Sequence, residues 1–250
     1  MGEYFLATDA VRYAAAALSD LGSKRPSNED SFGLSAEHGV YLVCDGMGGA
    51  AAGEIASSLA VSEMLRLLLS RSASAPLEEV IAQAIFAANL AIHTRAEHNL
   101  ELGGMGTTLV GIAVEGCRVL VFNVGDSRCY RLREGRLEQI SLDHSLVEEQ
   151  VRMGRMTHEE AQRSSMRNVI TRALGTQPTV EPDIFELQAE QGDLFLLCSD
   201  GLTGEVSDAQ IEALLAAPLP LDDLCATLVN AANQAGGHDN ITCLLLRAEN

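Results

Sequence analysis

The sequence contains no tryptophan, and aromatic residues make up only 4% of its 250 positions. Because 47% of the residues are nonetheless hydrophobic, the chain can bury a sizeable core, which must be built from aliphatic side chains. Basic residues are also few: 17 Lys and Arg stand against 35 Asp and Glu, a formal net charge of −18. A chain this acidic is not expected to bind nucleic acid or an anionic membrane surface.

Cysteine motifs and membrane segments are missing as well. The six cysteines are scattered, with no CxxC pair and no Cys/His spacing suited to zinc. We interpret them as reduced thiols of a cytoplasmic protein. No run reaches the roughly 18 continuous apolar residues of a membrane span, and the N-terminus lacks a basic-then-apolar signal. Without a repeat, linker or low-complexity segment, residues 1–250 are expected to form a single domain, and we expect a monomer.

The hydrophobic pattern predicts helices and strands joined by short connections. The alanine content of residues 11–20 indicates a helix, and amphipathic helices are predicted over residues 50–70, from Pro76, from Ser207 and over residues 221–232. Strands are predicted at residues 31–34, 40–44, 109–114, 118–124, 127–132, 137–140, 194–198 and 241–246, with strand-like character at 168–173 and 179–187. The short connections require antiparallel pairing, so an α+β fold is favoured over a parallel α/β sheet.

Residues 145–165 are more polar than the rest and are interpreted as an exposed helical insertion. One helix is predicted over residues 145–153, and Thr157-x-x-Glu160 has the form of a capping box that opens a second. The most basic patch of the chain lies here, formed by Arg152, Arg155, Arg163 and Arg167.

Acidic residues stand directly beside three of the apolar runs. Asp45-Gly46 ends the run 40–44, Asp200-Gly201 follows the run 194–198, and Asp239 precedes the run 241–246. An acid at the end of a buried strand is costly unless a cation or a hydrogen-bond donor meets it. A single Asp-Gly is most simply a turn that bonds to its own backbone, but the recurrence suggests that the fold brings these acids together.

Converging carboxylates would need a cation, because they could not all stay ionised without one. The candidate set is Asp45, Asp126, Asp200 and Asp239, with Glu29 and Asp30 nearby. All-oxygen ligation favours Mg²⁺ or Mn²⁺, leaves Ca²⁺ open and disfavours Zn²⁺. Two such ions about 4 Å apart are suited to phosphate-ester hydrolysis, and Arg25 could hold a phosphate or form a surface ion pair. Spacing alone does not separate this hypothesis from structural turn acids.

Seven short motifs, in a fixed order along the chain, resemble those of a known protein family. They are Arg25-x-x-Asn-Glu29-Asp30, Val43-Cys-Asp45-Gly46-Met-Gly-Gly49, Gly104-Met-Gly-Thr107-Thr108, Asn123-Val-Gly-Asp126-Ser-Arg128, Asp143-His-Ser145, Cys198-Ser-Asp200-Gly201 and Gly237-His-Asp239-Asn240. Over about residues 14–247 the chain resembles the metal-dependent protein phosphatases, the PPM family or type 2C serine/threonine phosphatases, in their bacterial form. The resemblance implies a four-layer α-β-β-α sandwich, in which two central antiparallel sheets are flanked by pairs of helices and a small helical flap is added at about residues 145–165.

The resemblance also implies a function and a set of ligands. The expected enzyme hydrolyses phosphoserine and phosphothreonine in proteins and reverses bacterial Ser/Thr kinase signalling, with two Mn²⁺ or Mg²⁺ ions and a third, weaker one. By motif, Asp45 would bridge two metals and the Gly46 carbonyl would bind one of them. Asp200 and Asp239 would hold the other metal, and Glu29 would act through metal-bound water.

Two further residues and the flap receive roles from the same resemblance. Asp126 matches the position that helps to hold the third metal, and Arg25 matches the arginine that contacts the substrate phosphate, so that Arg25, Asp45 and Asp239 are the expected catalytic residues. The flap arginines could engage acidic residues of a phosphopeptide or form only a solvated helix face.

One position departs from many members of the family. Many eukaryotic members carry a histidine after the Asp-Gly, whereas this chain has Met47, which cannot donate a proton. Metal-bound water could serve as the acid instead, since His38, His144 and His238 have no independent support. Two alternatives stay open: a phosphatase dedicated to one regulator protein or a small phosphoester, and a non-catalytic binding protein on the same fold.

Overall fold

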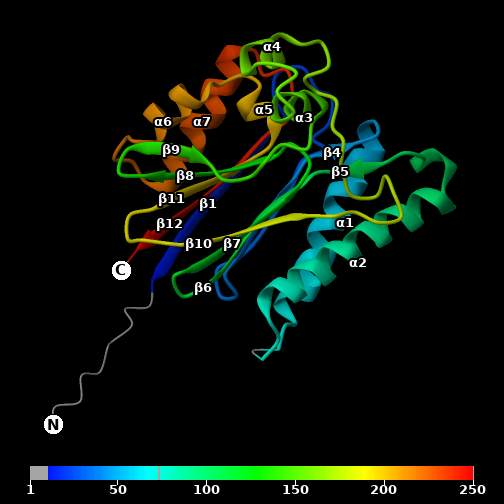
Figure 1. Ribbon diagram of the computed structural model, residues 1–250, viewed down its shortest axis with the longest axis horizontal. Coiled ribbons are helices and arrows are strands. Elements are labelled where there is room, and N and C mark those ends of the chain that lie inside the picture. Colours follow the sequence, from blue (N-terminus) through cyan, green and yellow to red (C-terminus); the bar gives the residue numbers. More distant parts are fainter. Residues whose placement is uncertain (1–10, 73, 250) are drawn as a thin grey trace.

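The computed structural model describes residues 11–72 and 74–249, and two antiparallel sheets of five strands each lie face to face at its centre (Figure 1). The first sheet contains, in spatial order, β1 (Arg12–Asp20), β12 (Ile241–Glu249), β11 (Leu194–Cys198), β8 (Arg128–Arg133) and β9 (Arg136–Gln139). The second contains β10 (Asp183–Gln188), β7 (Arg118–Val124), β6 (Leu109–Glu115), β3 (Val40–Cys44) and β2 (Ser31–Ser35). The predicted antiparallel pairing of the short-linked strands is confirmed.

Helices cover the outer face of each sheet. α1 (Ala50–Leu69) and α2 (Leu77–His98), followed by the short 3₁₀ helix η1 (Leu100–Leu102), pack over the second sheet, while α6 (Asp208–Leu215) and α7 (Leu221–Ala235) pack over the first (Figure 1). The two helix pairs therefore lie on opposite sides of the molecule, which confirms the predicted four-layer α-β-β-α sandwich. Among the helices that the structure describes, none is both long and apolar enough to cross a bilayer.

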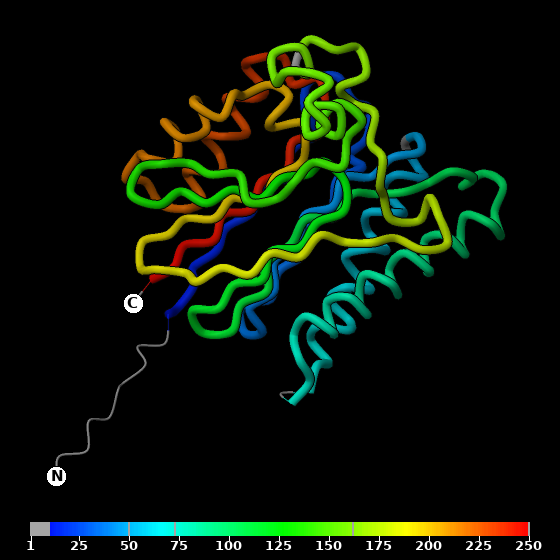
Figure 2. Tube along the Cα trace, viewed as in Figure 1, coloured from blue at the N-terminus to red at the C-terminus, as the bar shows by residue number. Residues whose placement is uncertain are grey.

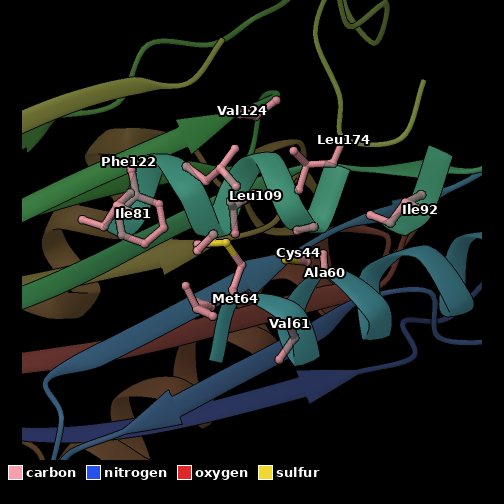
Figure 3. Close-up of a cluster of buried hydrophobic side chains, with 14 of the residues drawn as sticks. Cys44, Ala60, Val61, Met64, Ile81, Ile92, Leu109, Phe122, Val124 and Leu174 are labelled. Carbon is pink, nitrogen blue, oxygen red and sulfur yellow. The ribbon is translucent and has the colours of Figure 1, made fainter. Parts of the chain in front are cut away.

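Three apolar clusters hold these layers together. One lies between the sheets, one beneath α1 and α2, and one beneath α6 and α7. Figure 3 shows the second cluster, where Met64 and Ile81 of the helices meet Leu109 and Phe122 of the strands. Each of these four side chains is fully buried, and burial of a side chain of this kind contributes about 1.5–3 kcal/mol. The core is largely aliphatic, as the composition predicts.

The alanine-rich segment at the start of the described chain is a strand, so the helix predicted for residues 11–20 is wrong. β1 pairs with β12 along its whole length, from Arg12 opposite Glu249 to Asp20 opposite Ile241. Its alternating residues face the inter-sheet cluster on one side and α7 on the other. The strand ladder and burial on both faces outweigh the intrinsic helix preference of alanine, which amounts to less than about 1 kcal/mol per residue.

The flap consists of two short helices, as predicted. α3 (Leu146–Arg152) begins after Ser145, and α4 (His158–Arg163) opens with the predicted capping box of Thr157 and Glu160. The strand-like character predicted for residues 168–173 is wrong, because that segment contributes only a single bridge between Ile170 and Ser145. In the chain trace of Figure 2 the flap lies at one end of the sandwich.

Candidate metal centre

Asp45 follows β3 and its backbone is fixed by two threonines. Its N–H donates to Oγ1 of Thr108 at 2.9 Å, and its carbonyl accepts from the Thr108 N–H and the Thr107 hydroxyl, both at 2.8 Å. Both threonines are buried. Since β3 is itself paired on both edges, by β2 and β6, these bonds set the direction in which the Asp45 carboxylate leaves the sheet.

Next to Asp45, glycines allow the backbones of Glu29, Gly46 and Gly53 to lie in contact. Gly46 starts the two-residue strand β4 (Gly46–Met47), which pairs with β5 (Gly106–Thr107). A Cβ atom at Gly46 would overlap the carbonyl oxygens of Glu29 and Gly53. A Cβ atom at Gly53, in the first turn of α1, would overlap the Glu29 carboxylate. The absence of side chains at Gly46 and Gly53 therefore allows a close approach of the backbone and leaves room for the Glu29 side chain.

Asp200 follows β11 in the other sheet and is the first residue of the short helix α5 (Asp200–Thr203). The preceding Ser199 is buried, and its hydroxyl donates to Oδ2 of Asp30 at 2.7 Å while accepting from the Thr242 N–H at 3.0 Å. The carboxylates of Asp200 and Asp45 lie close enough for each to affect the pKa of the other. The two strand-end acids, one from each sheet, therefore share one region.

Asp239 lies in the turn before β12 and contacts Arg25. Nη2 of Arg25 donates to Oδ2 of Asp239 at 2.6 Å, so the expected phosphate ligand is bound to an expected metal ligand. Asn240 ties the same two segments together: its side chain accepts from the Glu29 N–H at 2.8 Å and donates to the carbonyls of Leu21 and Ser27. The loop that carries Arg25 and Glu29 is thus held against the end of the last strand.

Asp126 lies in the turn that follows β7. The neighbouring Arg128 does not point a free guanidinium at the site, because Nε and Nη2 bind both oxygens of Asp143 at 2.7–3.0 Å. His144 is buried against the same turn, where its Nδ1 accepts from the Gly125 N–H at 3.1 Å. These contacts explain the Asp143-His-Ser145 motif as the structural support of the Asp126 turn.

The electrostatics show that the acids share one region. Burial raises the pKa of Asp45 well above its usual range, and further increases come from the charges of Asp30, Asp200, Asp126 and Asp239. Burial and the charge of Asp239 raise the pKa of Asp200. The pKa of Asp126 rises to about 7 through burial and the charges of Asp200 and Asp143. Carboxylates whose charges oppose one another in this way attract a cation.

The Glu29-Asp30 pair completes the acidic region. Burial raises the pKa of Glu29, which the charge of Asp239 also raises and that of Arg25 lowers. Asp30 is buried and its pKa rises to about 7, chiefly through burial. Its Oδ1 has no hydrogen-bond partner among the described residues. Sequence analysis named Asp30 only as a neighbour, and its burial in a polar network is a structural finding.

The donor set fits a hard divalent cation. The candidate donors are all oxygen atoms, and an unpartnered buried carboxylate oxygen, Oδ1 of Asp30, lies in the same region. Within residues 11–72 and 74–249, no group of three or more His, Cys, Asp or Glu side chains is already placed around a single point as ligands. Mg²⁺ usually keeps several waters and takes only one or two carboxylates, so the paired acids seen here fit it.

Among the residues that the structure describes, no histidine hydrogen-bonds to the candidate ligands. His38 bonds to Ser35 at 3.0 Å, and His238 bonds to Glu205 at 2.6 Å. Met47 lies in β4, where its Cε covers Gly106. His38, His144 and His238 thus each have another bonding partner in the fold.

Several residues that build the site were not predicted to do so. They are Thr107, Thr108, Ser199, Asn240 and Gly53, of which all but Gly53 lie inside the motifs already quoted. Their positions in the sequence could have identified them, because small polar residues beside a strand-end acid commonly bond to nearby backbone groups.

Comparison with known proteins agrees with this geometry. The family model described as Protein phosphatase 2C matches residues 23–245. The chain is 38% identical to the serine/threonine phosphatase stp of Listeria innocua, over 91% of this chain and 93% of that protein. It is 41% identical to the serine/threonine protein phosphatase PstP of Mycobacterium tuberculosis, over 95% of this chain and 45% of that protein.

A solved structure extends the likeness to three dimensions. The crystal structure of the catalytic domain of PstP, in complex with two manganese ions, superposes with a TM-score of 0.87 at 38% identity, over 96% of this chain and 100% of that one. The motifs, the sandwich and the meeting of the acids thus have one explanation: the chain belongs to the protein phosphatase 2C family.

Proposed function

We propose that this protein is a metal-dependent phosphatase of phosphoserine and phosphothreonine in proteins. The observation that carries the proposal is the position of Asp45 and Asp200 at the ends of strands from the two sheets, close enough that the charges of Asp200, Asp126 and Asp239 all act on the Asp45 carboxylate. Family membership and relatives named as serine/threonine phosphatases support the substrate class.

The proposed ligands are Glu29, Asp45, Gly46, Asp126, Asp200 and Asp239. Two divalent ions, when bound, supply a water acidic enough to attack phosphorus near neutral pH, and they offset the charge of the phosphoryl oxygens. Asp45 would contribute to both ions, and the charges of Asp200, Asp126 and Asp239 that act on its carboxylate support this central role. The complex of PstP with manganese supports Mn²⁺, and the oxygen donors suit Mg²⁺ equally. Asp126 is the proposed ligand of a third, weaker ion.

Arg25 can bind either the Asp239 carboxylate or a substrate phosphate. In the structure it binds Asp239 and is partly exposed. A phosphate monoester offers the same bidentate geometry as a carboxylate with more charge, so we propose that Arg25 turns from Asp239 to the substrate phosphate. That exchange would orient the phosphoryl group and free the Asp239 carboxylate for a cation. Met47 has no proton to give to the leaving oxygen, and water is the proposed proton source in its place.

The proposed partners are phosphorylated proteins and the Ser/Thr kinase system that modifies them. All six cysteines are free thiols, which supports a reducing compartment such as the cytoplasm. A non-catalytic protein on this fold is disfavoured by the complete set of acids. A phosphatase dedicated to one regulator or to a small phosphoester is the alternative that a substrate panel separates.

The test compares wild type with Asp45→Asn. With Mn²⁺ and a phosphothreonine peptide, wild type should release phosphate and Asp45→Asn should show no measurable turnover, while its circular dichroism spectrum stays that of wild type. Undiminished turnover in Asp45→Asn would contradict the assignment of the metal centre. Activity on small phosphoesters with none on any phosphopeptide would contradict the substrate class.

A further inference from the structure

β1 is an edge strand whose outer side is open. It is the last strand of the first sheet, and its nine residues pair with β12 on one side only (Figure 1). Among the residues that the structure describes, Arg12–Asp20 form no backbone–backbone hydrogen bond outside that ladder. Their backbone carbonyls receive one contact from a side chain, the Cys225 thiol at 3.6 Å from the Ala16 oxygen. A free strand edge of this kind is a template for pairing with another strand.

The other three edge strands are protected against such pairing. β9 is four residues long, and its Leu137 N–H donates to the Glu212 carboxylate of α6 at 2.7 Å. β10 carries the charged residues Asp183 and Glu186. β2 is five residues long and has a glycine at its centre. Short length, charge and coverage are the usual means of protecting an edge, and β1 has none of them: it has no charged residue, proline or glycine between its two ends.

Exposed apolar side chains lie next to this open edge. Leu21 directly follows β1, and Phe32 and Leu34 belong to β2, the edge strand of the second sheet that contacts β1. Their exposed fractions are 41%, 39% and 41%. The side of the sandwich formed by β1 and β2 therefore combines unpaired backbone with apolar surface, as an interface between chains does.

The two ends of β1 carry opposite charges on the same face of the sheet. Arg12 and Asp20 are separated by an even number of residues, so both side chains point towards the α7 side. Oδ1 of Asp20 accepts from Asn233 of α7 at 3.0 Å, and Oδ2 has no hydrogen-bond partner among the described residues. Arg12 is exposed and lies opposite Glu249, but the two form no ion pair in the described part of the chain. Both charges are therefore available to a further strand.

We propose that two copies of this chain pair antiparallel through their β1 edges, about a twofold axis at Ala16, and form a dimer with one continuous ten-stranded sheet. In this register Arg12 of each copy lies opposite Asp20 of the other, and Ala14 lies opposite Leu18. Residues directly opposite in an antiparallel pair share a face, so two ion pairs form at the ends while small side chains meet in the middle. β1 is thus complementary to itself, which favours a second copy over a strand of another protein.

The net charge sets the expected strength of this dimer. Each copy carries a formal charge of −18, and this repulsion opposes association, so we expect dissociation in the micromolar range. The proposal replaces the monomer expected from the sequence. That expectation treated residues 11–20 as a helix, which has no open edge, whereas the structure shows a strand.

The first experiment measures the dimer Kd by sedimentation velocity of the full chain with Mn²⁺, at about 1 to 300 µM protein. One cross-strand ion pair changes an equilibrium by roughly 1.4- to 5-fold, so Arg12→Gln, which removes both pairs, should raise the Kd roughly 2- to 25-fold. Arg12→Glu should raise it further, because both pairs become repulsive. The matched control is Arg95→Glu, which makes the same change of charge at an exposed position of α2 and should change the Kd by less than about twofold.

The second experiment tests the register by charge exchange. Arg12→Glu and Asp20→Lys chains should each dimerise poorly alone, but their mixture should form a heterodimer, because each substituted position then faces an opposite charge. Hydrogen exchange should show that the β1 amides of wild type become more protected as concentration rises, and that those of Arg12→Glu do not. If Asp20→Lys unfolds, Asp20→Asn keeps the oxygen that accepts from Gly22 and Asn233, and it should raise the Kd as Arg12→Gln does.

A monomer at every concentration overturns the inference, whether the β1 edge then stays open or pairs with a strand of another protein. A dimer whose Kd is the same in wild type and Arg12→Glu also overturns it, because the contact then lies on another face. Neither result bears on the proposed phosphatase function, since no substrate enters these experiments.

Discussion

Replacing Gly53 by alanine should weaken metal binding at the acidic region while leaving the protein folded. Gly53 lies in the first turn of α1 with an ordinary helical backbone, and a helix gains up to about 1 kcal/mol when glycine becomes alanine. The new methyl group would, however, overlap the Glu29 carboxylate and lie 2.9 Å from the carbonyl carbon of Gly46. The Glu29 side chain is the more flexible of these two neighbours and should be displaced from the acidic region, while the Gly46 backbone, itself a candidate ligand, must also shift.

The magnitude follows from the role of the displaced group. Loss of a residue that supports metal ligands costs about 10- to 100-fold in metal affinity, or about 1.4–2.8 kcal/mol. Isothermal titration with Mn²⁺ should show this loss in Gly53→Ala, while urea denaturation of the metal-free protein should show a loss of stability below about 3 kcal/mol, because the helix preference of alanine offsets part of the cost of the Gly46 contact. Ser62→Ala is the matched control, because it adds helix preference at an exposed position of the same helix.

A double variant tests whether the effect passes through Glu29. In a Glu29→Gln background, Gly53→Ala should lower Mn²⁺ affinity by less than about twofold, since the group it displaces has already lost its charge. The reasoning would be refuted by wild-type affinity in Gly53→Ala, or by an equal loss in both backgrounds.

Three further substitutions test other contacts. Arg25→Ala should raise the KM for a phosphopeptide roughly tenfold with a smaller change in kcat, and Arg25→Lys should restore little, because the lysine ammonium cannot bind in bidentate geometry. Thr108→Val should lower the free energy of unfolding by about 1–3 kcal/mol in urea denaturation, because the Asp45 N–H loses its acceptor. Burial lowers the pKa of His144, so the unfolded chain binds a proton at a higher pH than the folded chain does. The contribution of His144 to stability is therefore full above about pH 6.5 and falls below it. In His144→Gln, the urea midpoint should fall less between about pH 7.5 and 5.5 than it does in wild type.

Each of these outcomes has a clear opposite. An Arg25→Ala variant with lower kcat and unchanged KM would place the arginine in a role other than phosphate binding. A Thr108→Val protein as stable as wild type would mean that the Asp45 backbone finds another partner. Equal pH dependence in wild type and His144→Gln would assign the acid sensitivity to other groups.

Much of the fold could be predicted from the sequence where side-chain periodicity and turn residues agree. The helix α1 and the strands β3, β6, β7 and β11 were predicted close to both of their ends, and α2 was predicted close to its start. Prediction failed at β1, where alanine favours a helix and pairing with a strand at the far end of the chain decides otherwise. The residues around β1 give no information about its pairing with β12 near the other end of the chain.

For the site, the acids were predicted but their supports were not. Asp45 and Asp200 could be recognised because an acid at the end of an apolar run is energetically unusual. The bonds of Thr108 and Ser199 depend on loops that meet only in the folded chain. The contact of Arg25 with Asp239 also joins segments that are far apart in the sequence. From the sequence, Arg25 could bind a phosphate or form a surface ion pair, and the structure shows an ion pair with a proposed metal ligand.

The pairing of β1 with β12 determines when the active enzyme can form during its synthesis. Arg12 lies opposite Glu249, and Asp239 is delivered by the turn that leads into this last strand. A ribosome-bound chain that lacks β12 can hold neither Asp239 nor the Asn240 bridge to the Glu29 loop. Catalytic competence should therefore appear in a single step late in synthesis, after the long-range strand pair closes, and not grow as the helices and hairpins form.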